Sequence, residues 1–201
     1  PKHYLILKTL CVPVCYCQLI CRLRTMRLNT YANVSKDFMI KKLANNIRKH
    51  AINMTSAGGS SHIGSILSIA DILATLYGSV MNYRADEPKW QGRDRFILSK
   101  GHGVLGLFSA LLAVGLISEK KYATYLTNES DLIAHPIMNL DLGIESSNGS
   151  LGQGLAMGIG IACAAKKNND LDYKAYVLMG DGECNEGSVW EAVMLAPQLK
   201  L

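Results

Sequence analysis

The sequence predicts an α/β protein in which helices cover both faces of a mostly parallel sheet. Two short apolar runs, RFILS at 95–99 and AYVLM at 175–179, have the length and composition of buried strands. Segments with apolar residues three and four positions apart, the spacing of one helix face, surround them. Each strand runs directly into a glycine-containing turn. Because two strands are few for such a sheet, we expect the fold to be incomplete in this chain.

The first two helices are predicted from capping residues and apolar spacing. Ser35 is a favourable N-cap for a helix over 35–54, and Gly58 and Gly59 are placed to close it. The apolar residues of this helix recur at every fourth position, at Met39, Leu43, Ile47 and Ala51. A second helix over 66–81 carries a stripe typical of a buried face, made of Ile66, Ile69, Leu73, Leu76 and Val80.

The rest of the chain alternates in the same way. The strand at 95–99 leads into Lys100-Gly101-His102-Gly103, and residues 127–148 are predicted to form a long loop. The remaining helices are predicted over 104–117, which is apolar, over 119–126, over 151–167, which is rich in small residues, and from about Ser188 onward. Ligands of parallel sheets bind beyond the carboxyl ends of the strands, so the two glycine turns are expected at one edge.

Composition separates residues 1–34 from the rest. The chain has 201 residues, of which 49% are hydrophobic, as is typical of one folded domain. The net charge of +5 is a misleading average. Residues 1–50 hold ten Lys and Arg and one acid, whereas the remainder holds eleven against fifteen. The basic part lacks interleaved aromatic residues or a known recognition motif, so we expect no nucleic-acid partner. We predict a basic extension over 1–34 and a partial domain over 35–201.

The extension carries four cysteines, at positions 11, 15, 17 and 21, and allows three interpretations. Its apolar run is short for a membrane span and is interrupted by Lys8 and Pro13, so no membrane is expected. Its cysteines lack the spacing of a zinc site. In the third interpretation the segment is poorly ordered or not native, and Met26 is the natural start. The two remaining cysteines suggest no disulfide framework, which favours a cytoplasmic protein.

The most informative segment is AYVLMGDGECNEGSVW, over 175–190. Gly180 and Gly182 allow close approach of the backbone to a ligand, and Asp181 between them is a hard oxygen donor. A following helix favours anions at its N-terminus. These parts suit a diphosphate bridged by Mg²⁺, since Mg²⁺ takes few carboxylates and completes its shell with phosphate oxygens and water. An ordinary turn with a solvated aspartate remains the alternative.

Four sequence blocks, taken in order, carry a family resemblance. They are SSHIGSILSIADILATLY, RDRFILSKGHG, HPIMNLDLGIESSNGSLGQGLAMGIG and VLMGDGECNEGSVWEA. From about Asp37 to its end, the chain resembles the thiamine-diphosphate-binding part of transketolase, especially the form split over two genes. The phrase GSLGQG after a His-Pro loop favours transketolase over deoxyxylulose-phosphate synthases and E1-type dehydrogenase components, which share the GDG turn.

The resemblance implies a role for each matching residue. His62, His102 and His135 are expected at the reacting centre, with His102 also contacting the cofactor. The implied cofactor-binding residues further include Gly149, Leu151, Gly180, Asp181, Gly182 and Glu183. Asp181 is the implied ligand of Mg²⁺, or of Ca²⁺ or Mn²⁺ in its place. Glu186 is the implied interface residue.

Each position also has an ordinary structural interpretation. His62 and His135 could brace loops, and Glu186 could simply favour the positive end of a helix. Ser61 and Ala134 stand where the family usually has glycine before the two histidines, which puts the placement of these histidines in doubt.

The implied activity is transfer of a two-carbon ketol unit between ketose and aldose phosphates, as in the pentose phosphate pathway. The family's activating glutamate lies on a pyrimidine-binding domain that no part of this chain resembles. We therefore expect a partner, namely a separate C-terminal subunit, in a homo- or hetero-oligomer, and no activity from this chain alone. The family's metal-binding motif also continues to an Asn beyond Leu201, so we expect a truncated site. Another thiamine-diphosphate enzyme or a non-catalytic fragment are the alternatives.

Overall fold

Three parallel strands form the sheet of the computed structural model, which describes residues 6–8, 30–59, 61–168 and 171–201, with side chains from residue 35 onward. The strand order is β1-β3-β2, with β1 at Ile6–Lys8, β2 at Arg95–Leu98 and β3 at Ala175–Leu178. β2 and β3 confirm the two predicted strands. β1 lies within the segment predicted as an extension, and the other residues before Thr30 lie outside the described part of the chain.

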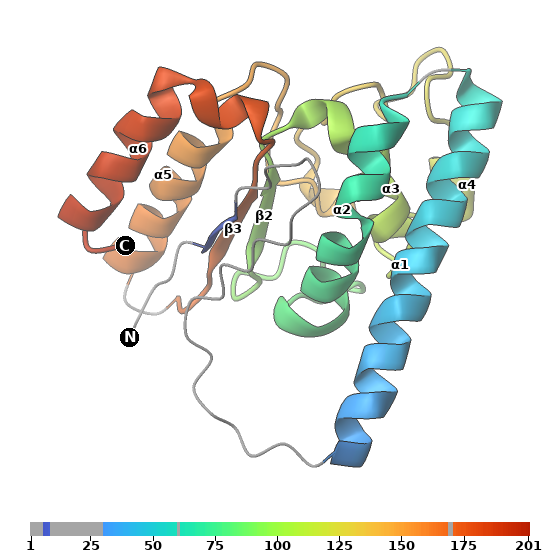
Figure 1. Ribbon diagram of the computed structural model, residues 1–201, viewed down its shortest axis with the longest axis horizontal. Coiled ribbons are helices and arrows are strands. Elements are labelled where there is room, and N and C mark those ends of the chain that lie inside the picture. The colour runs from blue at the N-terminus through green and yellow to red at the C-terminus, as the bar shows by residue number, and fades with distance from the viewer. Residues whose placement is uncertain (1–5, 9–29, 60, 169–170) are drawn as a thin grey trace.

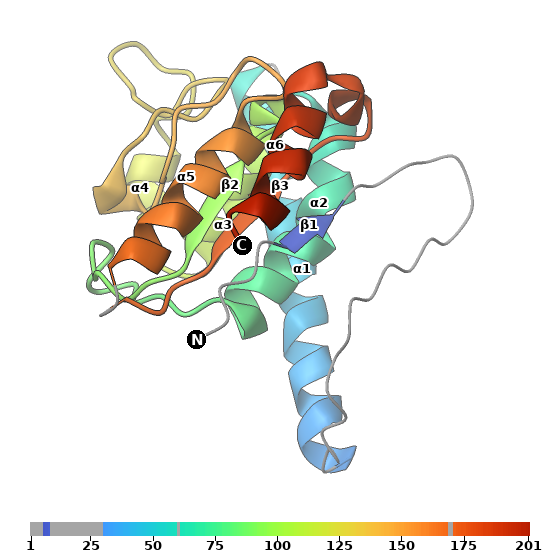
Figure 2. The same ribbon diagram turned by 90° about the vertical axis from the view of Figure 1, so that its left-hand side faces the viewer.

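Helices lie on both faces of this sheet, as the sequence predicts (Figures 1 and 2). One face is covered by α1 (Thr30–Gly58), α2 (Ile63–Thr75) and α3 (Val104–Ala113), with the short α4 (Glu119–Tyr122) against α3. The opposite face is covered by α5 (Gly154–Lys167) and α6 (Gly187–Gln198). The result is a three-layer α/β/α arrangement.

The strands fill two separate cores because successive side chains point to opposite faces of the sheet. Phe96 and Leu98 of β2 join the larger core with α1, α2 and α3. Ile97, which lies between them, joins the smaller core with α5 and α6. All four residues of β2 and all four of β3 are buried, which explains why these strands, apart from Arg95, are apolar on both faces rather than alternating.

Helix boundaries differ from the sequence predictions near the capping residues. α1 begins at Thr30, so Ser35 lies inside the helix and is not its N-cap. α2 begins at Ile63 and continues into a π-helical turn over Leu76–Val80.

Two glycines in left-handed conformations account for two further differences. α3 ends at Ala113, four residues early, and Gly115 follows it with a φ of +83°. Gly152 has a φ of +81° in the turn before α5, so this helix begins at Gly154 instead of Leu151. Positive φ is readily adopted by glycine, and both helices are therefore shorter than their apolar patterns suggest.

One segment is long and apolar enough to cross a membrane by length and composition, namely Ile63–Val80 with a mean hydropathy of 1.6. In the structure it packs against α1 and α3. Three residues of the predicted stripe, Ile66, Ile69 and Leu73, are fully buried there. Leu76 is only partly buried and Val80 is exposed, so the stripe does not continue through the π-helical turn that contains them.

Candidate cofactor-binding site

The carboxyl ends of β2 and β3 meet at one edge of the sheet, where parallel pairing places Leu98 beside Leu178. The turn after β3 and the residues after β2 border a cavity of about 340 Å³, within the range of small-molecule sites. Its lining is contributed by α2, by both strand ends and by the turn before α5: Ser65, Ser68, Lys100, His102, Leu151, Gly180, Asp181, Gly182 and Glu183. Five of the predicted cofactor-binding residues and His102 therefore line one cavity.

Lys100 supplies a buried positive charge to this cavity. Its exposed fraction is only 7%, although lysine is among the side chains least often buried. Burial lowers the pKa of Lys100, while the nearby carboxylates of Asp181 and Glu183 act in the opposite direction. A cation held in this way is suited to an anionic ligand.

Ser65 supplies a hydroxyl that lacks a partner. It lies in the first turn of α2, and its Oγ is buried without a hydrogen-bond partner among the residues that the structure describes. A Cβ on Gly103 would lie 3.4 Å from Ser65 Oγ and 3.8 Å from Lys100 Cε, so both groups border the same small region. An unpaired buried hydroxyl is costly, and a ligand oxygen beside Lys100 would satisfy it.

The Gly-Asp-Gly turn borders the cavity from the side of β3. Asp181 is exposed, and a Cβ placed on Gly182 would meet no described atom within 4 Å. Across the described ranges, no three His, Cys, Asp or Glu side chains are grouped as a metal site. An accessible carboxylate beside a cavity that contains a buried lysine fits a Mg²⁺ ion that takes its other ligands from phosphate and water.

The three predicted histidines come together beside this cavity. The rings of His62 and His102 are 5.2 Å apart in an edge-to-face arrangement. Burial lowers the pKa of His102, and positive charge on His62, Lys100 and His135 lowers it further. A lowered pKa favours a neutral imidazole at neutral pH, which can both donate and accept a hydrogen bond.

The loop that carries His135 packs close to the turn after β2, and two glycines lie beside the His135 ring. A Cβ on Gly101 would lie 3.2 Å from His135 Cδ2, and one on Gly149 would lie 3.8 Å from the same atom. The backbone amide of Asn148 donates a 3.1 Å hydrogen bond to the carbonyl of Pro136, which closes the loop behind the histidine. Gly149 therefore lies beside His135, and Leu151 lines the cavity.

Glu183 and Glu186 have different surroundings, although both follow the Gly-Asp-Gly turn. The carboxylate of Glu183 is buried and accepts hydrogen bonds from Ser99, Gly152 and Gly180. Glu186 is exposed, and its Cβ lies 2.8 Å from where a Cβ on Gly152 would be. The interface role of Glu186 stays a prediction.

Sequence reasoning missed Lys100 and Ser65 as site residues, although both lie in motif blocks. A lysine directly after a buried strand was an available signal for Lys100. The unpaired hydroxyl of Ser65 is visible only in three dimensions.

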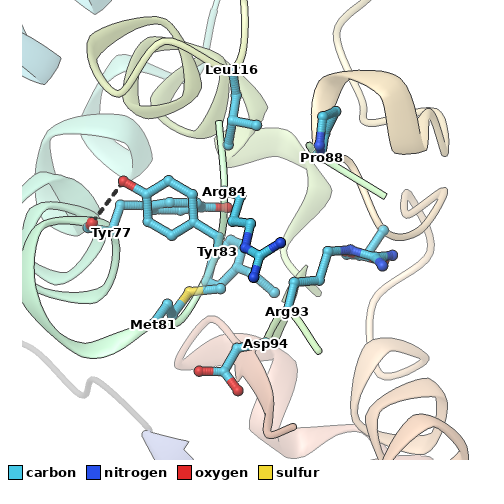
Figure 3. A pocket seen from close by; sticks show the side chains of 11 residues that line it. Tyr77, Met81, Tyr83, Arg84, Pro88, Arg93, Asp94 and Leu116 are labelled. Carbon is cyan, nitrogen blue, oxygen red and sulfur yellow. Dashed lines mark hydrogen bonds and ion pairs between the residues drawn. The ribbon is translucent and has the colours of Figure 1, made fainter. Parts of the chain in front are cut away.

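A second cavity, of about 20 Å³, lies at the amino end of β2 (Figure 3). It is lined by Tyr77, Tyr83 and Arg93 among others, and the Tyr83 hydroxyl donates a 3.0 Å hydrogen bond to the Tyr77 carbonyl. This volume holds about one water molecule and no cofactor. The larger cavity is therefore the candidate site.

The family described as "Transketolase, thiamine diphosphate binding domain" matches residues 39–201. The chain belongs to this family. An uncharacterized transketolase family protein of Sinorhizobium fredii is 38% identical over 170 residues, which are 85% of this chain and 61% of that protein. One of the subunits of an apulose-4-phosphate transketolase from Phocaeicola vulgatus is 44% identical over 154 residues, which are 77% of this chain and 54% of that protein.

A solved structure gives the same result for the fold. The crystal structure of transketolase from Campylobacter jejuni superposes with a TM-score of 0.72 at 34% identity, covering 79% of this chain and 26% of that one. The chain thus spans a little over half of the two family relatives named above and about a quarter of this transketolase. The α/β fold with helices on both faces and the family expected from the motif blocks are both confirmed.

Proposed function

We propose that this chain is the cofactor-binding part of a transketolase and that its larger cavity holds the diphosphate of thiamine diphosphate together with Mg²⁺. The observation that carries the proposal is the meeting of a cavity that contains the buried Lys100 with three histidines at one sheet edge. Bound thiamine diphosphate would supply the chemistry needed to transfer a two-carbon ketol unit from a ketose phosphate to an aldose phosphate.

The cavity fits the diphosphate by charge and by unsatisfied polar groups. Lys100 offers a buried ammonium, and Ser65 offers a hydroxyl without a described partner. Gly182 leaves space for an approaching oxygen, and Asp181 is accessible for the metal ion. A hydrogen bond to a charged group is worth about 1.5–3 kcal/mol, so two such contacts would contribute substantially to affinity.

The histidines have a separate proposed role beside the diphosphate. His62, His102 and His135 would hydrogen-bond sugar hydroxyls and hold or release protons at their ring nitrogens. The lowered pKa of His102 supports a neutral ring that can act in either direction. Leu151, an apolar residue at the cavity, would support the organic part of the cofactor.

A second polypeptide is part of the proposal. Two of the relatives, from Phocaeicola vulgatus and Actinobacillus succinogenes, are named as one of the subunits of an apulose-4-phosphate transketolase. This similarity supports a separate partner, which we propose carries the pyrimidine-binding domain. We further propose a cytoplasmic hetero-oligomer that acts on sugar phosphates.

Reconstitution tests the need for a partner. Mixing the chain with a C-terminal transketolase subunit should produce ketol transfer from xylulose 5-phosphate to ribose 5-phosphate, whereas pyruvate should not serve as donor. Transfer by this chain without the second polypeptide would contradict this part of the proposal.

Calorimetric titration tests the cofactor proposal without a partner. Thiamine diphosphate should bind weakly and only with Mg²⁺, and Asp181→Ala should abolish this binding. Asp86→Ala, which removes an exposed aspartate from the loop before β2 and is not among the residues that line the cavity, is the matched control. Binding that is indifferent to both Mg²⁺ and Asp181 would contradict the proposal.

A further inference from the structure

The carboxylate of Glu183 joins three segments that are distant in the sequence. Gly152 donates a backbone hydrogen bond of 2.9 Å to its Oε1, and Gly180 donates one of 3.0 Å to its Oε2. The Ser99 hydroxyl donates a third hydrogen bond to Oε1. One side chain therefore connects the end of β2, the turn after β3 and the turn before α5.

We propose that Glu183 is a positioning residue that fixes the turn of Leu151 and Gly152 relative to the Gly-Asp-Gly turn at the cavity. It would act through Gly180 on the Asp181 turn and through Gly152 on the neighbouring Leu151. The expected effect of Glu183 on the affinity for thiamine diphosphate rests on the function proposed above. The positioning of the two turns is a property of the protein without ligand and can be tested separately.

The carboxylate of Glu183 is occupied by contacts within the protein, which favours a structural role over direct contact with a ligand. The residue is 1% exposed, and both of its carboxylate oxygens already accept hydrogen bonds from the protein. A buried carboxylate is costly unless it is well hydrogen-bonded, and here three donors satisfy it. Glu183 thus differs from Asp181, which is exposed two residues earlier.

Ser99 extends the connection to α5. Its hydroxyl, fully buried, accepts a 3.1 Å hydrogen bond from the backbone of Gly154 while it donates to Glu183. A Cβ on Gly154 would lie 2.8 Å from Ser99 Cα, so only glycine allows this approach. The start of α5 is thereby held against the end of β2.

Glu183 provides one of two side-chain hydrogen bonds that hold the backbone of Gly152. Ser188 Oγ donates a 3.0 Å hydrogen bond to the Gly152 carbonyl, while Glu183 accepts from the Gly152 amide. With a φ of +81°, this turn is suited to glycine. Loss of the Glu183 carboxylate would leave the Gly152 backbone with only the hydrogen bond from Ser188.

Glu183→Gln tests the proposal with little change of shape. A glutamine presents one oxygen and one NH₂ group, so it cannot accept at both positions. In the full chain without ligand, amide hydrogen exchange at Gly152 or Gly180 should become at least tenfold faster, with a shifted amide proton resonance. Amides of Ile97 and Val177 in the neighbouring strands should be unaffected beyond any change in global stability.

Leu111→Ala is the control for a purely structural effect. Leu111 is fully buried in α3, in the core on the other face of the sheet, so this variant should lower overall stability. It should leave the Gly152 and Gly180 resonances in place. If Glu183→Gln only reproduces the behaviour of Leu111→Ala, the positioning role is wrong.

Affinity for thiamine diphosphate with Mg²⁺ provides the second measurement. Groups that orient ligating residues typically change affinity by roughly 10–100-fold, and Glu183→Gln should weaken binding within this range. Ser99→Ala, a second variant in case the first does not fold, should act in the same direction. Unchanged affinity together with unchanged amide exchange overturns the proposal. If the wild-type chain binds no cofactor, the proposed function fails, and amide exchange alone still decides whether Glu183 positions the turns.

Discussion

The backbone of Gly101 lies directly against that of Asn148. A Cβ on Gly101 would be 2.9 Å from the Asn148 carbonyl carbon, closer than real Cβ atoms approach. This contact joins the turn after β2 to the loop that carries His135. It explains why the two segments bring His102 and His135 beside each other, although they are far apart in the sequence.

Gly101→Ala should therefore disturb both stability and the site. Forcing a methyl group into a packed contact typically costs about 1–3 kcal/mol, and here the obstacle is backbone. Urea unfolding should show this loss. Gly160→Ala in α5 is the control, because a Cβ there meets no described atom within 4 Å, and it should be neutral or stabilising by up to about 1 kcal/mol. Equal stability of the two variants would contradict the packing argument.

The ion pair of Arg93 and Glu145 should contribute strongly to the free energy of unfolding when one partner is removed. It is bidentate, with distances of 2.7 and 2.9 Å, and both side chains are less than 10% exposed. Glu145→Ala should destabilise by about 3–5 kcal/mol, because it leaves a buried guanidinium unpaired. The double change Arg93→Met with Glu145→Leu should cost less than Glu145→Ala alone.

The exposed pair Arg84–Glu87 provides the comparison in the same unfolding experiment. Glu87→Ala should change stability by less than about 1 kcal/mol, as is usual for surface pairs. If Glu87→Ala lowered the free energy of unfolding as much as Glu145→Ala does, burial could not be the cause of the large effect at Glu145.

Lys100→Met should weaken the binding of thiamine diphosphate with Mg²⁺. Loss of one charge-assisted contact predicts a decrease of roughly tenfold or more in a calorimetric titration. Lys120→Met removes an exposed lysine from α4 and should leave the affinity unchanged. Equal affinities for the two variants would exclude Lys100 from the anion site.

Protonation of His102 should destabilise the folded chain in mild acid. Burial lowers the pKa of His102 below its ordinary value of 6.5, and His62, Lys100 and His135 contribute in the same direction, against Glu183. The unfolded state therefore binds the proton more readily, so the free energy of unfolding should fall as pH drops through 6.5 towards the lowered pKa. His102→Asn should show a smaller fall in urea unfolding between pH 7.5 and 5. Parallel curves would contradict this assignment.

The α/β arrangement of the fold and many residues of the candidate site could be predicted from the sequence. Local patterns identified β2 and β3, and parallel pairing then required Lys100 and Gly180 to lie at one edge. Helix boundaries were less predictable because they depend on the backbone conformations of Gly115 and Gly152, which the apolar spacing does not reveal.

The long-range contacts could not be predicted from the sequence. Glu183 meets Ser99 across 84 positions and Gly152 across 31, and no local pattern fixes such pairs. Lys100 belongs to a type of side chain that is normally exposed, so its burial depends on the surrounding fold.

A crystal structure of the chain with thiamine diphosphate and Mg²⁺ would test the central claim most directly. We expect diphosphate oxygens within hydrogen-bond distance of Ser65 Oγ and Lys100 Nζ, and the metal ion beside the carboxylate of Asp181. Cofactor bound at another surface, with this cavity empty, would contradict the account.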